Sequence, residues 1–290
     1  MEINKFFQKI LSNQINISNI KTVCLALGPY RNLTTLTSSI LALHPTCQVL
    51  NHASDRIFSD KHINFLLDYN QGKFDAFTKY AIYISKSGKR GRYGGSITLS
   101  HAFDYDNIQE AYQARYGKSL IKERIECLFW KEPLRTSNFI KQNQVDLGAI
   151  FEENDKLRFL MPIRNPLDCA SSNLKTGHVR FFVGLNQQSS LEEVLVGILK
   201  ELLWFLKLHT DYPERFFYYF ENSFEDQVLL SLANFLRIEP DSKWLQTSLA
   251  NFKVKRDYQY DSYTVDYYNN FVKENFSVYP EVLEQLSLFT

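Results

Sequence analysis

Short apolar runs alternate along the chain with segments of helical periodicity. The apolar runs lie at residues 21–27, 125–130, 157–163 and 216–220. Each has the length of a strand, and apolar runs without polar alternation are typical of strands buried on both faces of a parallel sheet. The pattern therefore predicts an α/β fold in which a parallel sheet is flanked by helices on both faces.

Helical spacing of apolar residues fills the intervals between these runs. Ser190 and Glu193 form a capping box that opens a long amphipathic helix, which extends to about residue 206. Ser223 followed by Asp226 resembles a second capping box, before a helix that reaches about residue 236. Further helices are expected at residues 5–20, 34–43, 137–142 and 166–175, and in the tyrosine-rich tail at 258–290. Residues 54–125 are irregular, and 85–95 are glycine-rich and predict a loop.

Composition argues against a nucleic-acid-binding protein and against a membrane-spanning one. The 290 residues are 44% hydrophobic, which suits one folded domain with a sizeable core. Lys and Arg total 33 against 32 Asp and Glu, for a net charge of +1, so the chain lacks the basic excess of a nucleic-acid-binding protein. We find no repeat, no linker that divides the chain, and no apolar run of the roughly 18 residues that would span a bilayer.

The four cysteines are widely spaced and form no metal-binding pattern. Cys24, Cys47, Cys127 and Cys169 show no CxxC or Cys/His spacing, so we expect reduced thiols, no zinc site and a cytoplasmic location. The first 20 residues alternate polar and apolar positions and make a poor signal peptide.

Two segments follow predicted strands and open predicted helices. Residues 28–36 read GPYRNLTTL, and residues 164–172 read RNPLDCASS. A strand that turns sharply into a helix leaves backbone N–H groups and the positive helix end directed at one point, where an anion binds. Each segment alone is also consistent with an ordinary capped turn, and Arg164 could simply form an ion pair with Asp168 or a carboxylate at the sheet edge.

Together the two segments resemble the nucleotide-binding signatures of the sulfotransferase family. In that family the first segment wraps the 5′-phosphate of the donor nucleotide. The resemblance assigns this role to Arg31 at the basic position, Asn32 at the serine position, and the pair Thr34 and Thr35. Leu33 stands where the family usually has glycine, a residue that permits unusual dihedral angles and close backbone approach.

The second segment supplies the 3′-phosphate site in this resemblance. Family members use an arginine and a serine at the spacing of Arg164 and Ser172 to bind the 3′-phosphate. The implied donor is 3′-phosphoadenosine 5′-phosphosulfate (PAPS), the implied product is 3′-phosphoadenosine 5′-phosphate (PAP), and no metal is required. Weaker similarities at 44–45, 130–133, 216–222 and 235–238 extend the match to residues 21–50 and 125–245.

Sulfuryl transfer needs cations near the leaving oxygen and a base for the acceptor proton. Arg31 and Lys131 are the candidate cations. By the family's spacing from the His44-Pro45 step, His52 is the candidate base, and a histidine titrates near working pH. His101 and Glu132 are the alternatives, both also candidates for contact with the acceptor, and a purely structural His52 remains open.

Two further basic segments are candidates for binding anions. Lys89, Arg90 and Arg92 lie in the glycine-rich loop, where they could close over the nucleotide or an anionic acceptor, or simply be solvated. Lys253, Lys255 and Arg256 lie where cytosolic relatives carry a basic loop to the 3′-phosphate, although the Arg-Lys-Gly form of that loop is absent.

The resemblance implies one sulfotransferase-like domain over residues 1–290, with residues 54–124 as an insertion that shapes the acceptor site. It implies a soluble, bacterial-type enzyme that moves a sulfuryl group from PAPS to a hydroxyl or amine of a sugar or small-molecule acceptor. The alternatives are a non-catalytic module that binds a nucleotide or a partner, and an ATP-dependent kinase. The kinase alternative lacks the G-x-x-x-x-G-K-S/T loop.

Overall fold

The computed structural model describes residues 8, 11–89, 93–104, 106–254 and 258–290. Its centre is a six-stranded sheet in the order β3-β2-β4-β1-β5-β6. The strands are β1 (Thr22–Ala26), β2 (Cys47–Asn51), β3 (Gly95–Ser96), β4 (Cys127–Lys131), β5 (Leu157–Ile163) and β6 (Phe216–Phe220). All neighbouring strands pair in parallel except β3, which pairs antiparallel with β2 at the edge. The mostly parallel α/β fold is therefore confirmed.

Side chains of the central strand alternate between two cores. Val23 and Leu25 of β1 belong to one buried cluster, whereas Cys24 and Ala26 belong to another on the opposite face. Because successive residues of a strand point to opposite faces, both faces of β1 are covered. This explains why β1 is apolar from Val23 to Ala26 and does not alternate.

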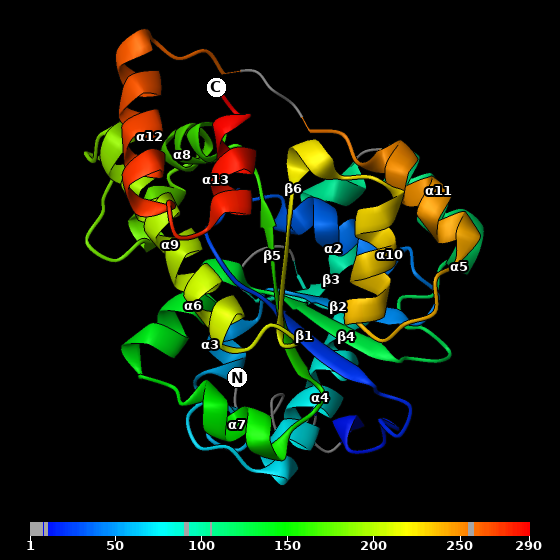
Figure 1. The fold of residues 1–290 in the computed structure, drawn as a ribbon. Helices are drawn as coiled ribbons and strands as arrows, with labels where there is room; N and C mark the ends of the chain where they lie inside the picture. The colour runs from blue at the N-terminus through cyan, green and yellow to red at the C-terminus, as the bar shows by residue number, and fades with distance from the viewer. Residues whose placement is uncertain (1–7, 9–10, 90–92, 105, 255–257) are drawn as a thin grey trace.

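Helices cover both faces, as Figure 1 shows. Against the core of Cys24 lie α2 (Thr34–Ala42), α5 (Asp106–Tyr116), α10 (Asp226–Phe235) and α11 (Ser242–Asn251). Against the core of Leu25 lie α4 (Gln71–Ser85), α6 (Pro133–Gln142), α7 (Leu147–Glu153), α8 (Pro166–Lys175), α9 (Leu191–Asp211), α12 (Ser262–Asn275) and α13 (Pro280–Ser287). The short helix α3 (Ser54–Ile57) follows β2.

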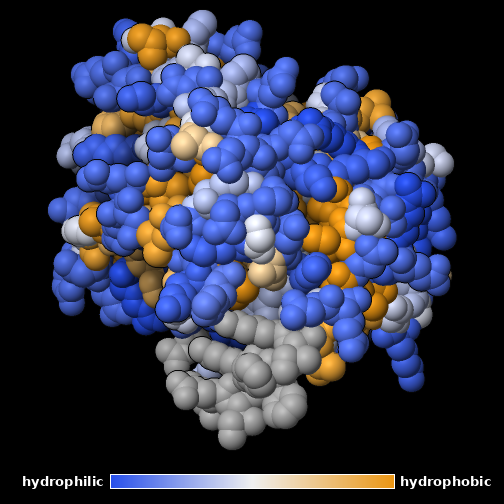
Figure 2. All heavy atoms as spheres, turned by 90° about the horizontal axis from the view of Figure 1, so that it is seen from below, coloured by the Kyte–Doolittle hydropathy of each residue, from blue (hydrophilic) through white to orange (hydrophobic). Residues whose placement is uncertain are grey.

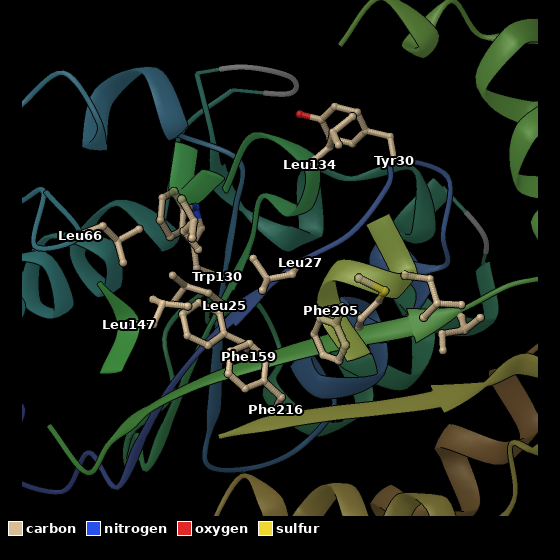
Figure 3. Close-up of a cluster of buried hydrophobic side chains, with 14 of the residues drawn as sticks. Leu25, Leu27, Tyr30, Leu66, Trp130, Leu134, Leu147, Phe159, Phe205 and Phe216 are labelled. Carbon is tan, nitrogen blue, oxygen red and sulfur yellow. The ribbon is translucent and has the colours of Figure 1, made fainter. Parts of the chain in front are cut away.

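Aromatic side chains fill much of the core that contains Leu25. Phe159 of β5 stacks on Phe216 of β6 with 5.0 Å between ring centroids, and Phe205 of α9 meets Phe216 edge to face. Figure 3 shows these rings beside Leu25, with Tyr30 and Leu134 together at one end of the cluster. The stack joins two register partners near the amino ends of β5 and β6, and Arg164 follows the opposite, carboxyl end of β5.

Most predicted elements lie where the apolar pattern placed them. The bounds of β5 and β6 match the predicted runs, and the capping box of Ser190 and Glu193 opens α9 as expected. The second predicted capping box is wrong: Ser223 ends a 3-10 turn, and α10 begins after Glu225 with no side-chain cap. Helix α6 begins at Pro133, earlier than predicted. The predicted helix at 5–20 is wrong in its second half: Leu11 and Ser12 are helical, but residues 13–20 form turns and irregular structure. Residues 5–7, 9 and 10 lie outside the described residues.

The surface offers no large apolar face in the view of Figure 2, where hydrophilic residues predominate and hydrophobic ones form separate groups. None of the described helices has the length and apolarity to cross a membrane. The four cysteines are buried as free thiols within the strands β1, β2 and β4 and helix α8.

Candidate active site at the carboxyl edge of the sheet

The loop between β1 and α2 turns through left-handed backbone conformations. Gly28 has φ of 95°, and a Cβ there would lie 2.7 Å from the Cε of Met161. Arg31 and Leu33 also have positive φ, 63° and 59°. Leu33 therefore adopts the conformation for which glycine is the usual residue, so the loop keeps a glycine-like path without the glycine.

This loop leaves hydrogen-bond donors at the start of α2. Leu33 is the N-cap residue and supplies no side-chain acceptor for the first N–H groups of the helix. Thr34 and Thr35 form the first turn, and neither hydroxyl hydrogen-bonds to another residue of the described chain. Uncapped N–H groups at a helix N-terminus, with hydroxyl donors beside them, suit an anion.

The two sequence segments meet directly. The Asn32 side-chain Oδ1 accepts a hydrogen bond of 2.8 Å from the backbone N–H of Arg164, and the Arg31 Nε donates to the Ser172 Oγ over 2.9 Å. Parallel pairing of β1 with β5 places the loops that follow them side by side. The two segments therefore form one hydrogen-bonded junction, with Ser172 bonded to Arg31.

Arg164 lies between β5 and α8, among polar and aromatic groups. Its Nη2 is 3.6 Å from the Asp168 Oδ2, so the ion pair considered in the sequence analysis is present. Tyr260, from the segment before α12, donates a 2.8 Å hydrogen bond to the Asp168 Oδ1, and the Tyr258 ring lies 6.0 Å from the Arg164 guanidinium. The C-terminal segment therefore closes one side of this part of the site.

A second group of residues lies where β2 and β4 end. Lys131 is the last residue of β4, Glu132 follows it, and His52 follows β2. The His52 Nδ1 lies 3.3 Å from the Glu132 Oε1, and the Lys131 Nζ lies 3.3 Å from the His52 Nε2. An ammonium group can only donate, so Nε2 accepts from Lys131 and Nδ1–H donates to Glu132.

The backbone holds His52 in a strained position. The His52 N–H donates to the Lys131 carbonyl over 3.0 Å, and its carbonyl accepts from the Trp130 indole over 2.6 Å. His52 and Ala53 have φ of 58° and 83°. With Arg31 and Leu33, they account for four of the six non-glycine residues of positive φ in the described chain. Such strain concentrates at functional sites.

Electrostatics ties these side chains into one buried cluster. Burial would raise the pKa of Glu132, but hydrogen bonds from His52 and Tyr30 and the nearby Lys131 charge outweigh it and lower the pKa to about 2. Burial lowers the pKa of Lys131 to about 8, against the opposing effect of Glu132. Glu132 is therefore an ionised acceptor, and Lys131 is a cation whose proton is held less firmly than usual.

The remaining predicted residues lie apart from this cluster or outside the described chain. His101 lies in the 3-10 turn η2 (His101–Asp104), is mostly exposed, and pairs through Nδ1 with Asp104 at 3.3 Å. Its role as base or acceptor contact finds no support in that position. Arg90, Arg92, Lys255 and Arg256 lie outside the described residues.

Sequence reasoning missed two aromatic residues of the site. The Tyr30 hydroxyl donates to the Glu132 Oε1 over 2.9 Å, and burial together with Glu132 raises its pKa. His178, in the turn η3 (His178–Phe181) after α8, has its ring 5.4 Å from that of Tyr30. For Tyr30 a signal existed, because it lies within the first phosphate-site segment. For His178 none did.

Comparison with known proteins gives similarity to solved structures only. No protein-family model matches the chain, and no curated protein matches it. A mouse sulfotransferase in complex with PAP aligns over 97% of this chain and 92% of its own, with 11% identity and a TM-score of 0.45. A sulfotransferase from Mycobacterium avium aligns over 97% of this chain and 80% of its own, with 13% identity and a TM-score of 0.46.

A sulfotransferase from Alicyclobacillus acidocaldarius gives 12% identity and a TM-score of 0.43 over 92% of this chain and 97% of its own. All three TM-scores are below 0.5. The assignment of a reaction to this chain therefore depends on the residues of the site itself.

Proposed function

We propose that the chain transfers a sulfuryl group from PAPS to a hydroxyl or amine of a sugar or small-molecule acceptor. The observation that supports this most strongly is the meeting of two sequence segments at one sheet edge. They join through Asn32 with Arg164 and through Arg31 with Ser172, and the same edge holds His52, Glu132 and Lys131. Ligands of open α/β sheets bind outside the carboxyl ends of the strands, where these residues lie.

The residues present suit a donor with two phosphate positions. Arg31, the hydroxyls of Thr34 and Thr35, and the N–H groups of α2 would hold the 5′-phosphate. Arg164, just before α8, and the Ser172 hydroxyl, in the second turn of α8, would hold the 3′-phosphate. The left-handed Leu33 supports this assignment, because it gives the loop the path that a glycine would give it.

The donor supplies the sulfuryl group and a stable leaving nucleotide. In the proposed reaction, a bond forms between sulfur and the acceptor oxygen or nitrogen while the bond from sulfur to the bridging phosphate oxygen breaks. His52 Nε2 takes the acceptor proton, and Glu132 holds Nδ1–H so that Nε2 stays the acceptor. Lys131 and Arg31 stabilise the charge that develops on the nucleotide. Lys131 must then exchange its contact with His52 for the donor.

The acceptor would enter beside the segment 54–124, which we propose shapes its site. Ser54, the first residue of that segment, directs its backbone N–H toward the Glu132 Oε2 at 3.4 Å. Asp55 forms an ion pair of 2.5 Å with Arg135 of α6. The start of the segment is therefore fixed against the proposed catalytic cluster.

The first test is a thermal-shift comparison of PAP with ADP and ATP. A ligand at a hundred times its dissociation constant adds about 2.7 kcal/mol to the unfolding free energy. We expect stabilisation by PAP well above that by ADP or ATP, and loss of this preference in Arg164→Ala. Arg124→Ala, which changes an exposed arginine paired with Glu126, is the matched control and should keep the preference.

The other outcomes of this test separate the alternatives. An equal response to ATP would favour a kinase, and no response to any nucleotide would contradict the proposed donor site. Stabilisation by PAP without turnover on any acceptor would favour a non-catalytic nucleotide-binding module.

A further inference from the structure

A group of basic and aromatic side chains extends from the proposed catalytic cluster toward solvent. We call it the basic wall and define it as Arg135, His178, Arg180 and Phe181. The Phe181 ring lies 4.9 Å from the Arg180 guanidinium and 5.4 Å from that of Arg135. Helix α6 supplies Arg135, and the turn η3 supplies the other three residues. Two cations therefore flank one aromatic ring.

The basic wall is connected to the proposed catalytic residues by direct contacts. The Tyr30 ring lies edge-on to both Phe181 and His178, with 5.4 Å between centroids in each case. The hydroxyl of the same Tyr30 donates to Glu132. Burial lowers the pKa of His178, and the charges of Arg31, Arg180 and Lys131 lower it further. His178 is thus close enough to interact electrostatically with Arg180 of the basic wall and with Arg31 and Lys131 of the proposed catalytic site.

The two arginines of the wall differ in their partners. Arg135 donates to the Ser54 Oγ and to the Asp55 carboxylate, so its charge is compensated. Arg180 is exposed and forms no ion pair with any carboxylate of the described residues. An arginine guanidinium presents two parallel N–H donors that match a carboxylate. Arg180 therefore offers one uncompensated positive charge at the rim of the site.

The surrounding charges favour an anion at this rim. Four fixed cations, Arg31, Lys131, Arg135 and Arg180, are near two carboxylates, Glu132 and Asp55. A donor nucleotide would engage Arg31 and Lys131 deep in the site, but Arg180 lies outward of them beside Phe181. The four cations exceed the two carboxylates, and a local excess of positive charge attracts anions.

We propose that the acceptor carries a carboxylate, as a uronic acid does, and that the Arg180 guanidinium binds this carboxylate. The single uncompensated guanidinium matches the single charge of a carboxylate. This inference rests on the proposed function, because it assigns the acceptor side of the same site. It adds a substrate class that the phosphate-site segments do not specify.

The test uses two probes that differ only at one sugar carbon, 4-nitrophenyl β-D-glucuronide and 4-nitrophenyl β-D-glucoside. Calorimetric titration into the full chain saturated with PAP measures their affinities. We expect the glucuronide to bind about tenfold more tightly than the glucoside, the range of a hydrogen-bonded charge pair. Arg180→Gln should reduce this ratio to about twofold or less. Lys175→Gln, an exposed cation at the end of α8, should leave it unchanged.

Arg180→Lys keeps the positive charge but removes the two parallel N–H donors of the guanidinium. This variant should therefore retain only part of the preference for the glucuronide. Equal binding of the two probes, binding of neither, or an unchanged ratio in Arg180→Gln would overturn the inference. Failure of PAP to bind would instead contradict the proposed function. The probes are then titrated into the free chain, where a glucuronide preference that depends on Arg180 supports the basic wall and its absence overturns it.

Discussion

Glu132 is the residue on which the proposed chemistry depends most. It is buried, and its Oε1 faces both the Tyr30 hydroxyl and the His52 Nδ1. A buried carboxylate with these donors remains ionised far below neutral pH. Glu132 is therefore better suited to orient His52 than to take a proton from the acceptor. Of these two candidate bases, the structure favours His52.

Replacement of His52 tests this assignment. We expect His52→Ala to lower kcat by about 100-fold or more, the usual contribution of a general base, with PAP affinity near wild type. His101→Ala is the matched control and should retain wild-type turnover, because His101 contacts Asp104 away from the cluster. Initial rates with radiolabelled PAPS provide the measurement. Wild-type turnover in His52→Ala would transfer the role of base to Glu132 or His101.

Leu33 gives a prediction about stability. Its φ of 59° costs an ordinary L-residue about 1–2 kcal/mol, whereas glycine adopts it freely but loses more entropy on folding. We expect Leu33→Gly to leave the free energy of unfolding within about 1 kcal/mol of wild type, or to raise it. Leu36→Gly, inside α2, should destabilise the protein. Urea unfolding distinguishes the two, and a marked loss of stability in Leu33→Gly would show that its side-chain packing outweighs the backbone strain.

At the scale of elements, α9 is the longest helix in the described chain, and its first turn is closed by reciprocal hydrogen bonds. The Ser190 Oγ accepts from the Glu193 N–H, and the Glu193 Oε2 accepts from the Ser190 N–H. The buried face of α9 packs against α8, which begins two residues after Arg164 and contains Ser172. The stability of α9 therefore contributes to holding α8, and with it the proposed 3′-phosphate site, in place.

Loss of the cap should be measurable. Ser190→Ala is expected to lower the unfolding free energy by about 1 kcal/mol, as is usual for an N-cap serine. Ser190→Asp retains an acceptor at the cap and serves as the control, with stability near wild type. Chemical denaturation checks both variants. Equal destabilisation by the two substitutions would mean that the side-chain acceptor is not the stabilising feature.

The sequence predicted elements well where one physical signal was strong. Continuous apolar runs identified β5 and β6, since strands covered on both faces contain few polar residues. Strand β2 was not predicted because it contains Gln48 and Asn51, which are buried. The amide of Gln48 is satisfied by Ser85 and by the Leu120 carbonyl, contacts that depend on tertiary structure.

The candidate site was predictable only in part, because some of its contacts also depend on tertiary structure. Arg31, Thr34, Arg164 and Ser172 belong to segments with a recognisable spacing. The hydrogen bond from Tyr30 to Glu132 joins residues 102 positions apart. No local pattern indicates such a contact, and none indicates that η3 brings Arg180 and His178 beside Tyr30.

At the scale of the whole molecule, Lys122 joins three elements around a buried amine. Its Nζ donates to the Ala42 carbonyl at the end of α2 over 2.8 Å and lies over the rings of Tyr112 and Tyr116 of α5. Its backbone N–H donates to the Gln48 side chain of β2. Burial lowers the pKa of this lysine from 10.5 to about 6, and Arg115 acts in the same direction.

This lowered pKa predicts a pH dependence of stability. Between about pH 6 and 10.5 the unfolded chain keeps the Lys122 proton and the folded chain loses it. Stability should therefore rise with pH in this window, by at most about 1.4 kcal/mol per pH unit. As pH rises from 7 to 10, the unfolding free energy of wild type should increase relative to that of Lys122→Met, which lacks the titrating amine. A difference that is independent of pH would contradict the lowered pKa.

The position of β1 has a consequence for how the chain folds. Both strands that flank this central strand, β4 and β5, are made more than 100 residues after it, and the bond from Arg164 to Asn32 spans 132 positions. During synthesis β1 is therefore made long before the two strands that pair with it. Closing such long loops slows folding. The proposed anion-binding edge thus arises late, after β5 has docked, so nucleotide binding would report completion of the fold and not an early intermediate.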